Sequence, residues 1–401
     1  MFLVCEPIAW GLEHVSFNAS LLKTIRYAYP NDTIYFHGEA AHVRHIREEI
    51  GEGFADSIMW RTLVLPPRHA SFFSRVPLDF KNVRLLINRL NMHPESCVLV
   101  ITGSPSLLWA LKSFAGKVQN NKKIQVIFHG ILAHLGHRRS SIKSFIRSLD
   151  PFFRINHIKT ALKIFGHRGI HYIVLEEPIR DAVLKELPFL QNNIDVLDHP
   201  MPIDEQPVET NNYSLPIQFG FLGLTTKHKG FFKYLNLAYD ISSRYPGLAN
   251  FHVIGRLHKS YVGVDLPEMA VLSTKPGTER LSRDEYTQSV NQLHYVCLFH
   301  DKYYELSASG VLIDSVAKEK PIIATRLPIF ENLERRFGEI GYLCTNGEFS
   351  KTIGNILGNI DSNRYNRQVL NMHRVKVSRT SESLAKQYRK LVERLQMKQV
   401  D

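Results

Sequence analysis

The sequence predicts an α/β protein built from two doubly wound domains that face each other across a cleft. Its 401 residues are enough for two hydrophobic cores. Short apolar runs alternate with segments whose apolar residues recur three and four apart, which is typical of parallel strands joined by crossover helices. A polar segment with three prolines between Pro202 and Pro216 interrupts this pattern, and it predicts the linker.

The first domain is expected to span residues 1–203. Its strands should lie in β-branched or aromatic runs closed by turn residues. Helices between such strands imply a parallel sheet that is covered on both faces. We expect strands at 2–5, 33–38, 62–66, 97–103, 124–130, 171–177 and 193–200, and helices at 17–30, 40–51, 81–92, 105–118 and 178–190.

The same alternation restarts after the linker and predicts a second domain at 204–362. A basic tail, 363–401, should form terminal helices that pack back on the first domain. We expect strands at 217–223, 250–256, 269–274, 295–300, 320–325 and 341–345, with helices at 229–245, 281–293 and 329–337 and one beginning near Ser309.

Composition is that of a soluble globular protein, with 44% hydrophobic and 22% charged residues. No run approaches the ~18 apolar residues of a membrane-spanning helix. The start, MFLVCEPIAWGLEH, predicts a first strand and not a signal peptide. Four scattered cysteines form no CxxC pair, which favours buried thiols in a reducing cytoplasm.

The net charge of +12 is concentrated in parts of the chain. Between His137 and Arg168 eight Lys/Arg accompany one acid, and apolar residues there recur at helical spacing. This make-up predicts interfacial helices on an anionic membrane, with Ile158 and Leu162 on their apolar side and Arg138, Arg139, Lys143 and Arg147 on their basic side. The alternative is an amphipathic pair packed on its own sheet with a solvated basic face.

Several common motifs are absent. The chain has no GxGxxG after a first strand, no Walker A, no HExxH and no GxSxG, which disfavours the familiar dehydrogenase, phosphotransferase, metalloprotease and esterase classes. No acidic DxD stands at a strand end, so no metal site is expected.

Candidate site residues follow predicted strands, because ligands of open parallel sheets bind beyond the carboxyl ends of the strands. Gly223 and Lys229 follow one strand, and Ser309 and Gly310 begin a helix whose free N–H groups favour an anion. Asp314, one turn further, could accept hydrogen bonds from a sugar hydroxyl. The alternatives are an ordinary helix cap at Ser309 and a solvated loop lysine.

Residues 217–345 resemble the nucleotide-sugar-binding domain of GT-B glycosyltransferases, especially family 4. The family pattern is G-R-L-x-x-x-K-G, a strand ending V-x-G, then E-x-F-G-L-x-x-x-E-A-x-A-x-G-x-P-V-V-A. This chain has GLTTKHKG, FHVIGR and ELSASGVLIDSVAKEKPIIAT in the same order. The resemblance implies two Rossmann-like domains, a nucleotide-diphosphate sugar as co-substrate, and no further cofactor or metal.

By position, the resemblance implies that Lys229 contacts the phosphates and that Asp314 holds the ribose. The phosphate-facing helix start falls on Ser309, Gly310 and Val311, whereas Gly11 and His129 match family positions only loosely.

Two departures from the family pattern affect the expected mechanism. Leu224 replaces a phosphate-contacting arginine, for which Arg256 could substitute. Leu306 replaces the first glutamate, and Glu305, one position earlier, is a catalytic and donor-binding candidate. The retaining mechanism of family 4 is therefore not assumed. An inverting enzyme would need a base in the first domain, where Glu13 and His129 follow predicted strands.

The expected function is transfer of a sugar, hexosyltransferase-like, from a nucleotide-diphosphate donor to a saccharide acceptor. The acceptor is expected to be lipid-linked, in bacterial exopolysaccharide or other surface-polysaccharide biosynthesis, with the protein cytoplasmic and peripheral on the inner face of the cell membrane. One alternative is a GT-B nucleotide-sugar 2-epimerase. Another is a non-catalytic GT-B-like protein that binds membrane or nucleic acid, although no nucleic-acid motif is present.

Overall fold

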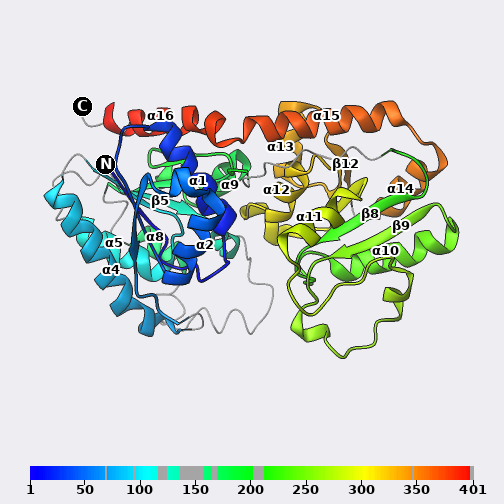
Figure 1. Cartoon of the computed structure of the whole chain (residues 1–401), viewed down its shortest axis with the longest axis horizontal. Helices are drawn as coiled ribbons and strands as arrows, with labels where there is room; N and C mark the ends of the chain where they lie inside the picture. Colours follow the sequence, from blue (N-terminus) through cyan, green and yellow to red (C-terminus); the bar gives the residue numbers. More distant parts are fainter. Residues whose placement is uncertain are drawn as a thin grey trace. The chain divides into compact units, whose positions relative to one another are not determined.

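The computed structural model describes residues 1–67, 70–93, 96–115, 124–135, 157–164, 169–201, 212–345 and 347–397, without the side chains at 134, 303, 396 and 397. The chain forms two compact units (Figure 1). The first comprises Met1–Ile203, Leu306–Ala308 and Arg379–Asp401, and the second comprises Asp204–Glu305 and Ser309–Ser378. The tail 363–401 is thus divided between the two units.

The first unit contains a seven-stranded sheet in the order β3-β2-β1-β4-β5-β6-β7, with every neighbouring pair parallel. All-parallel pairing joined by helices confirms the predicted α/β class for this unit. The strands are β1 (Phe2–Cys5), β2 (Ile34–Gly38), β3 (Ile58–Thr62), β4 (Cys97–Val100), β5 (Ile124–Phe128), β6 (His171–Val174) and β7 (Ile194–Val196).

Helices cover both faces of this sheet. Leu3 and Cys5 of β1 belong to one hydrophobic core, and Phe2 and Val4 belong to the other. Because strand side chains alternate between faces, a strand with both faces covered is apolar throughout. The helices are α1 (Val15–Ala28), α2 (Ala40–Ile50), α3 (Glu52–Ala55), α4 (Phe72–Met92), α5 (Pro105–Ala115), α8 (Ile158–Lys163), α9 (Glu177–Glu186) and α16 (Ser381–Met397).

The last helix belongs to the first unit. α16 packs along α1 (Figure 1), and Leu384, Tyr388 and Leu391 enter the core that holds Val4. The hydroxyl of Tyr388 also donates a hydrogen bond to Oε1 of Gln125, at 3.1 Å. The chain therefore completes the first unit only after passing through the second.

The strand predicted at 62–66 is wrong, because β3 ends at Thr62. Residues 58–62 alternate instead: Ile58 is buried, whereas Met59 and Arg61 are exposed, as expected for a strand at the sheet edge. The apolar residues that follow, 63–65, run into Pro66 and Pro67, which cannot donate to a ladder.

The second unit contains a five-stranded parallel sheet in the order β12-β11-β10-β8-β9. Its strands are β8 (Ile217–Leu222), β9 (Ala249–Ile254), β10 (Tyr295–Leu298), β11 (Ile322–Thr325) and β12 (Gly341–Cys344). Its helices are α10 (Phe231–Arg244), α11 (Arg283–Asn291), α12 (Gly310–Ala317), α13 (Pro328–Phe337), α14 (Phe349–Gly358) and α15 (Ser362–Ser378).

The strand predicted at 269–274 is also wrong. Pro267–Val271 forms a 3-10 helix, for which a proline in the first turn is suited. Only the end of the segment runs beside β9, through an isolated bridge between His252 and Thr274. Within the described residues, no helix combines the length and apolarity needed to cross a membrane.

The strand orders fix where ligands can bind in each unit. In the first unit the chain adds β2 and β3 on one side of β1 and then places β4 on its other side. In the second unit it adds β9 on one side of β8 and then places β10 on the other. Loops that follow these strand pairs diverge and leave a crevice at the carboxyl edge.

Candidate functional site

The switch point of the second unit gathers most of the predicted donor residues. Gly223 follows β8, and the segment that leads to Ser309 and Gly310 follows β10, which pairs with β8. Gly223 and Ser309 are 86 positions apart in the chain, yet they belong to loops at the same carboxyl edge of the sheet.

The loop after β8 closes tightly over the end of β10. Gly230 has φ of +76°, and a Cβ there would lie 2.3 Å from Cβ and 2.7 Å from the carbonyl oxygen of Phe299. Only glycine tolerates both the left-handed backbone and this approach. A contact of 2.9 Å between Nδ1 of His228 and Oδ2 of Asp301 ties the same loop to the segment after β10. Lys229 is thereby held at the switch point.

Lys229 lies against the end of β8 and the first turn of α12. A Cβ on Gly223 would lie 2.9 Å from Nζ of Lys229 and 3.7 Å from Cγ2 of Val311. Lys229 is half-buried, whereas Lys227 and His228 are exposed, so it is not an ordinary solvated loop lysine. Burial lowers the pKa of Lys229, and the negative charge of Asp314 opposes that shift. A partly desolvated ammonium gains most from an anionic partner.

The start of α12 combines a structural cap with an open approach. Oγ of Ser309 accepts a hydrogen bond from the backbone N–H of Leu312 at 3.2 Å, so this hydroxyl is the ordinary N-cap of the alternative interpretation. Gly310 is exposed, and a Cβ on it would meet only open space. The first-turn N–H groups of Gly310 and Val311 have no acceptor within the helix pattern, which leaves them suited to an anion.

Asp314 is held by a residue that the sequence analysis did not single out. The hydroxyl of Tyr286, on α11, donates a hydrogen bond to Oδ2 of Asp314 at 2.8 Å. Burial raises the pKa of Asp314, while Tyr286 and the charge of Lys229 act in the opposite direction. One carboxylate oxygen is thus fixed by the protein, and Oδ1 receives no hydrogen bond from the described residues.

His300 is a second residue that was missed. It lies just beyond β10, is 2% exposed, and its ring stacks on Tyr304 with centroids 4.0 Å apart. Burial and the nearby charge of Lys229 lower the pKa of His300 to about 3, so it is a neutral ring beside the lysine. The sequence could have indicated His300, because it follows a predicted strand and this criterion had already selected His129.

Arg256 and Glu305 follow β9 and β10, at the same carboxyl edge of the sheet. Gly255 has φ of +144°, and a Cβ on it would lie 2.3 Å from the carbonyl oxygen of Gly223, so the turns after β8 and β9 touch. Arg256 follows with an exposed side chain. Glu305 is half-buried in the 3-10 helix Lys302–Leu306.

A buried carboxylate organises the loop after β1 in the first unit. Glu6 is fully buried and accepts hydrogen bonds from the N–H groups of Ile8 and Ala9, at 3.0 and 3.1 Å, and from Oγ1 of Thr102 at 2.7 Å. Glu6 and Thr102 follow β1 and β4, the pair at the switch point. The sequence could have indicated this role, because Glu6 is the one acid that interrupts the first apolar run.

Gly11 and Glu13 lie further along that loop. Gly11 has φ of +51°; its N–H donates to Oε2 of Glu39 at 3.2 Å, and its carbonyl oxygen lies 2.8 Å from Nδ1 of His42. Glu13 is exposed, and its Oε2 accepts a hydrogen bond from the N–H of Trp10 at 3.0 Å. Glu13 therefore helps to close its own turn.

His129 follows β5 and packs among aromatic rings. Its ring centroid lies 4.2 Å from that of His14 and 4.6 Å from that of Phe17. Burial and the neighbours His14 and His199 lower the pKa of His129 well below its usual range. Its Nδ1 is buried and has no hydrogen-bond partner among the described residues. A neutral imidazole with an unsatisfied nitrogen can accept a hydrogen bond, whereas the lowered pKa makes this ring a weak base.

The predicted membrane tract is only partly described. Arg138, Arg139, Lys143 and Arg147 lie outside the described residues. Ile158 and Leu162, expected on an apolar membrane face, are instead 1% and 0% exposed in the core of the first unit. Nζ of Lys112 donates hydrogen bonds to the carbonyl oxygens of Ala161 and Leu162, both at 2.7 Å. For α8 the structure therefore supports packing on its own sheet.

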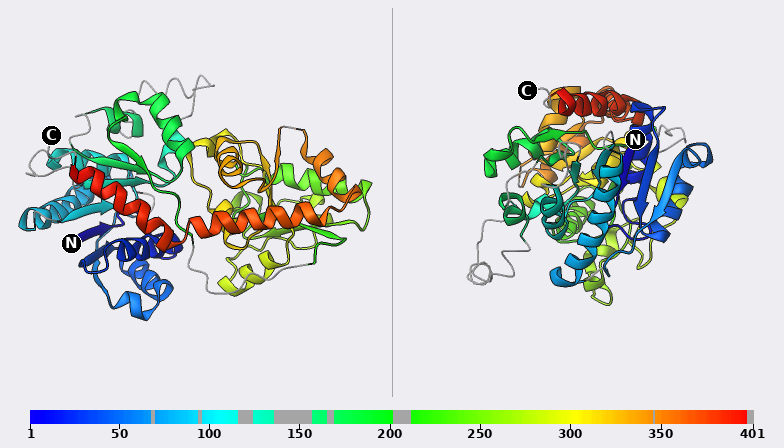
Figure 2. Two further views of the ribbon diagram at one scale, coloured as in Figure 1. Left: turned by 90° about the horizontal axis from the view of Figure 1, so that it is seen from above. Right: turned by 90° about the vertical axis from the view of Figure 1, so that its left-hand side faces the viewer.

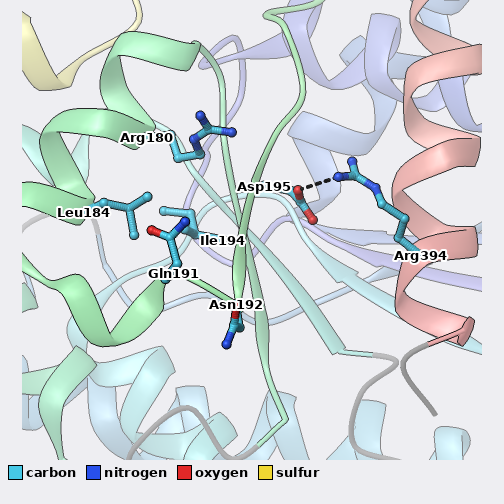
Figure 3. Close-up of a pocket in the computed structure, with 7 residues that line it drawn as sticks. All are labelled: Arg180, Leu184, Gln191, Asn192, Ile194, Asp195 and Arg394. Atoms are coloured by element: carbon cyan, nitrogen blue, oxygen red, sulfur yellow. Dashed lines mark ion pairs between the residues drawn. The ribbon is translucent and has the colours of Figure 1, made fainter. Parts of the chain in front are cut away.

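Two pockets lie away from these residues. One, of about 220 Å³, lies beside β7, where Arg394 of α16 reaches Asp195 at 3.2 Å (Figure 3). The other, of about 520 Å³, lies beside β12 and includes Arg326 and Arg364. Each combines arginines with acids, and neither contains a predicted donor residue.

Comparison with solved structures supports the fold. A glycosyltransferase from Rickettsia africae matches with a TM-score of 0.63 at 12% identity, over 99% of this chain and 98% of that one. HepE from Anabaena, solved with UDP and glucose, matches with a TM-score of 0.60 at 13% identity, over 98% and 99% of the two chains. The lipopolysaccharide outer core galactosyltransferase WaaB matches with a TM-score of 0.56 at 12% identity, over 95% and 97%.

No protein-family model matches the sequence, and no curated protein matches it. At the identities above, the structural likeness establishes the GT-B fold and does not single out family 4.

Proposed function

We propose that the protein is a glycosyltransferase that moves a sugar from a nucleotide-diphosphate donor to a saccharide acceptor. The observation that carries this proposal is the position of Lys229. Its partly desolvated ammonium lies beside Gly223 and the first turn of α12, where a diphosphate would meet both a cation and free N–H groups.

Each donor-site residue has a distinct role in this proposal. Lys229 and the N–H groups of Gly310 and Val311 bind the diphosphate and offset the charge that develops on it as the glycosidic bond breaks. Gly223 leaves room for the ammonium of Lys229, and Gly310 leaves room for phosphate oxygens. Asp314, oriented by Tyr286, accepts hydrogen bonds from the ribose. The scheme needs no metal ion or further cofactor, because Lys229 and the helix supply the electrostatic stabilisation.

Remaining candidates carry less specific roles. Arg256 supplies a further phosphate contact and Glu305 contacts the donor sugar. His129 and Glu13 remain candidates for a general base. Of these two, His129 is favoured because its buried Nδ1 has no hydrogen-bond partner among the described residues.

The biological setting is bacterial surface-polysaccharide assembly with a lipid-linked acceptor, which places the protein in the cytoplasm at the inner face of the membrane. The name of WaaB, a lipopolysaccharide galactosyltransferase of the same fold, and the regional positive charge support this setting. The tract with Arg138, Arg139, Lys143 and Arg147 is a proposed contact with anionic lipid.

Donor binding is the first test. Thermal unfolding should be followed with UDP, GDP, dTDP and CMP, each alone and as a sugar conjugate. One nucleotide diphosphate is expected to stabilise the protein by about 2.7 kcal/mol at a hundredfold excess over its Kd, because it binds only the folded state. Absence of any shift across the panel would remove the donor-site proposal.

Product analysis separates transfer from epimerisation. The active nucleotide sugar should be incubated with and without a saccharide or lipid-linked acceptor, and the products identified by mass spectrometry and NMR. A glycosylated acceptor and free nucleotide diphosphate are expected. An isomerised nucleotide sugar formed without acceptor would indicate the 2-epimerase alternative.

Tyr286→Phe tests how Asp314 is held. Loss of the hydroxyl removes a hydrogen bond that lowers the pKa of Asp314, so this carboxyl should protonate at a higher pH than in the wild type. Nucleotide binding is expected to weaken about fivefold, with the loss beginning at a higher pH. Calorimetric titration with the nucleotide at several pH values would measure both effects.

The matched control is Tyr286→Phe in an Asp314→Asn background. That pair of changes should behave like Asp314→Asn alone, because no carboxylate remains to be oriented. Equal losses from Tyr286→Phe in the two backgrounds would show that the tyrosine acts without Asp314.

A further inference from the structure

The stretch of the first unit from β3 to the end of α4 is basic and contributes no exposed acid. Between Met59 and Met92 the sequence holds six Lys/Arg and a single acid, Asp79. Asp79 is fully buried, and its Oδ2 accepts a hydrogen bond from Oγ of Ser106 at 2.6 Å. No acidic side chain of this stretch therefore offsets the cations on the outside.

Apolar residues share the exposed side of α4. Leu86, Ile87 and Leu90 face the core, whereas Leu85 is 40% exposed and Met92 is 67% exposed. One stripe of the helix holds four residues spaced by three, one and seven positions: Lys81, Arg84, Leu85 and Met92. α4 lies on the outside of the first unit in both Figure 1 and Figure 2.

The edge strand β3 continues this stripe. Met59 is 50% exposed, and the guanidinium groups of Arg61 and Arg89 flank the ring of Tyr35 at 5.9 and 5.6 Å. Arg89 comes from α4 and Arg61 from β3, so the shared tyrosine joins the two elements. In the part of the chain that the structure describes, neither arginine forms an ion pair.

We propose that this α4–β3 face, made of Met59, Arg61, Lys81, Arg84, Leu85 and Met92, binds a bilayer rich in anionic lipid. Unpaired cations match the phosphate layer, and the flexible apolar side chains between them can enter the acyl boundary below it. The apolar side chains of this face are aliphatic, and the exposed ring on α4, Phe73, lies in its first turn. This favours lipid over nucleic acid, for which a series of stacking aromatic rings would be expected. The face shares no residue with the tract at 138–147, and the proposal does not depend on the donor chemistry.

The test is co-sedimentation of the full-length protein with vesicles of phosphatidylcholine alone or mixed equally with phosphatidylglycerol. Binding is expected only to the mixed vesicles and should weaken as salt rises. The double variant Lys81→Glu, Arg84→Glu should bind at least about thirtyfold more weakly, because loss of the two cations alone would produce that factor. Leu85→Ser with Met92→Ser should weaken binding with little change in its salt dependence.

The matched control is Lys386→Glu with Lys390→Glu, an exposed pair on α16 of the same unit. It makes the same change in net charge and should bind as the wild type does. A third variant reverses Arg138, Arg139, Lys143 and Arg147, which are a proposed lipid contact of their own, and it should weaken binding without abolishing it because the α4–β3 face remains. Melting temperatures near that of the wild type would show that each variant is folded.

Three outcomes would overturn the inference. These are no binding of the wild type to mixed vesicles at low salt, unchanged binding of the Lys81 and Arg84 variant, and an equal loss in the α16 control. Binding of single-stranded RNA that the Lys81 and Arg84 variant abolishes, without vesicle binding, would assign the face to nucleic acid instead. None of these outcomes bears on donor binding, which the nucleotide panel measures separately.

Discussion

Lys229→Ala is expected to lower the rate of sugar transfer by about a hundredfold or more. The ammonium lies beside Gly223 and Val311, where the leaving diphosphate gains negative charge as the glycosidic bond breaks. Because that charge is larger in the transition state than in the bound donor, kcat should fall and not only KM rise. Steady-state kinetics with the donor identified by the nucleotide panel would measure the change.

Lys227→Ala provides the matched control. Lys227 belongs to the same loop but is exposed, so its loss should leave kcat within a factor of two or so of the wild type. Both variants should unfold near the wild-type temperature, since neither removes a core side chain. Normal turnover by Lys229→Ala would disprove the assignment of this lysine to the leaving group.

Local patterns predicted most of the fold. Successive strand residues such as Leu3 and Val4 are buried in the cores on opposite faces of the sheet, and apolar runs of this kind were recognisable as parallel strands. The errors came where several conformations suit the same residues. Residues 62–65 are mostly apolar but run into Pro66, and 269–272 are apolar but follow Pro267, so tertiary contacts decided both.

The candidate site was less predictable, because its geometry depends on contacts between distant segments. The strand-end rule placed Lys229 and Asp314 at one sheet edge. It gave no indication that Tyr286 would hold Asp314, since α11 precedes the strand and the loop that lead to α12. The close approach of Gly230 to Phe299 likewise depends on strand pairing across the switch point. Glycine there is explained only once β8 and β10 are known to be neighbours.

Arg379→Met is expected to destabilise the first unit by about 3–5 kcal/mol. Arg379 and Glu176 are each 1% exposed, and the guanidinium donates two hydrogen bonds to the carboxylate, at 2.5 and 2.9 Å. Arg379 begins the segment that returns to the first unit, and its carbonyl oxygen accepts a hydrogen bond from the N–H of Met201. Methionine would leave the buried carboxylate of Glu176 without its cation.

The double variant Glu176→Leu, Arg379→Met separates charge from packing. Replacing both members of a buried ion pair by apolar residues of similar size is often neutral, because neither charge has then to be desolvated. Most of the lost stability should therefore return. Arg367→Met, at an exposed position of α15, should change stability by no more than about 0.5 kcal/mol.

Urea unfolding of these variants should be followed with probes for each unit, because a chain of two units need not unfold in one step. The transition of the first unit should move to lower urea in Arg379→Met and return in the double variant, while that of the second unit stays in place. If the double variant is as unstable as the single one, packing of the arginine stem and not its charge holds α16 on the first unit. If neither variant shifts the first transition, the buried pair contributes nothing to the closure of this unit by the last segment of the chain.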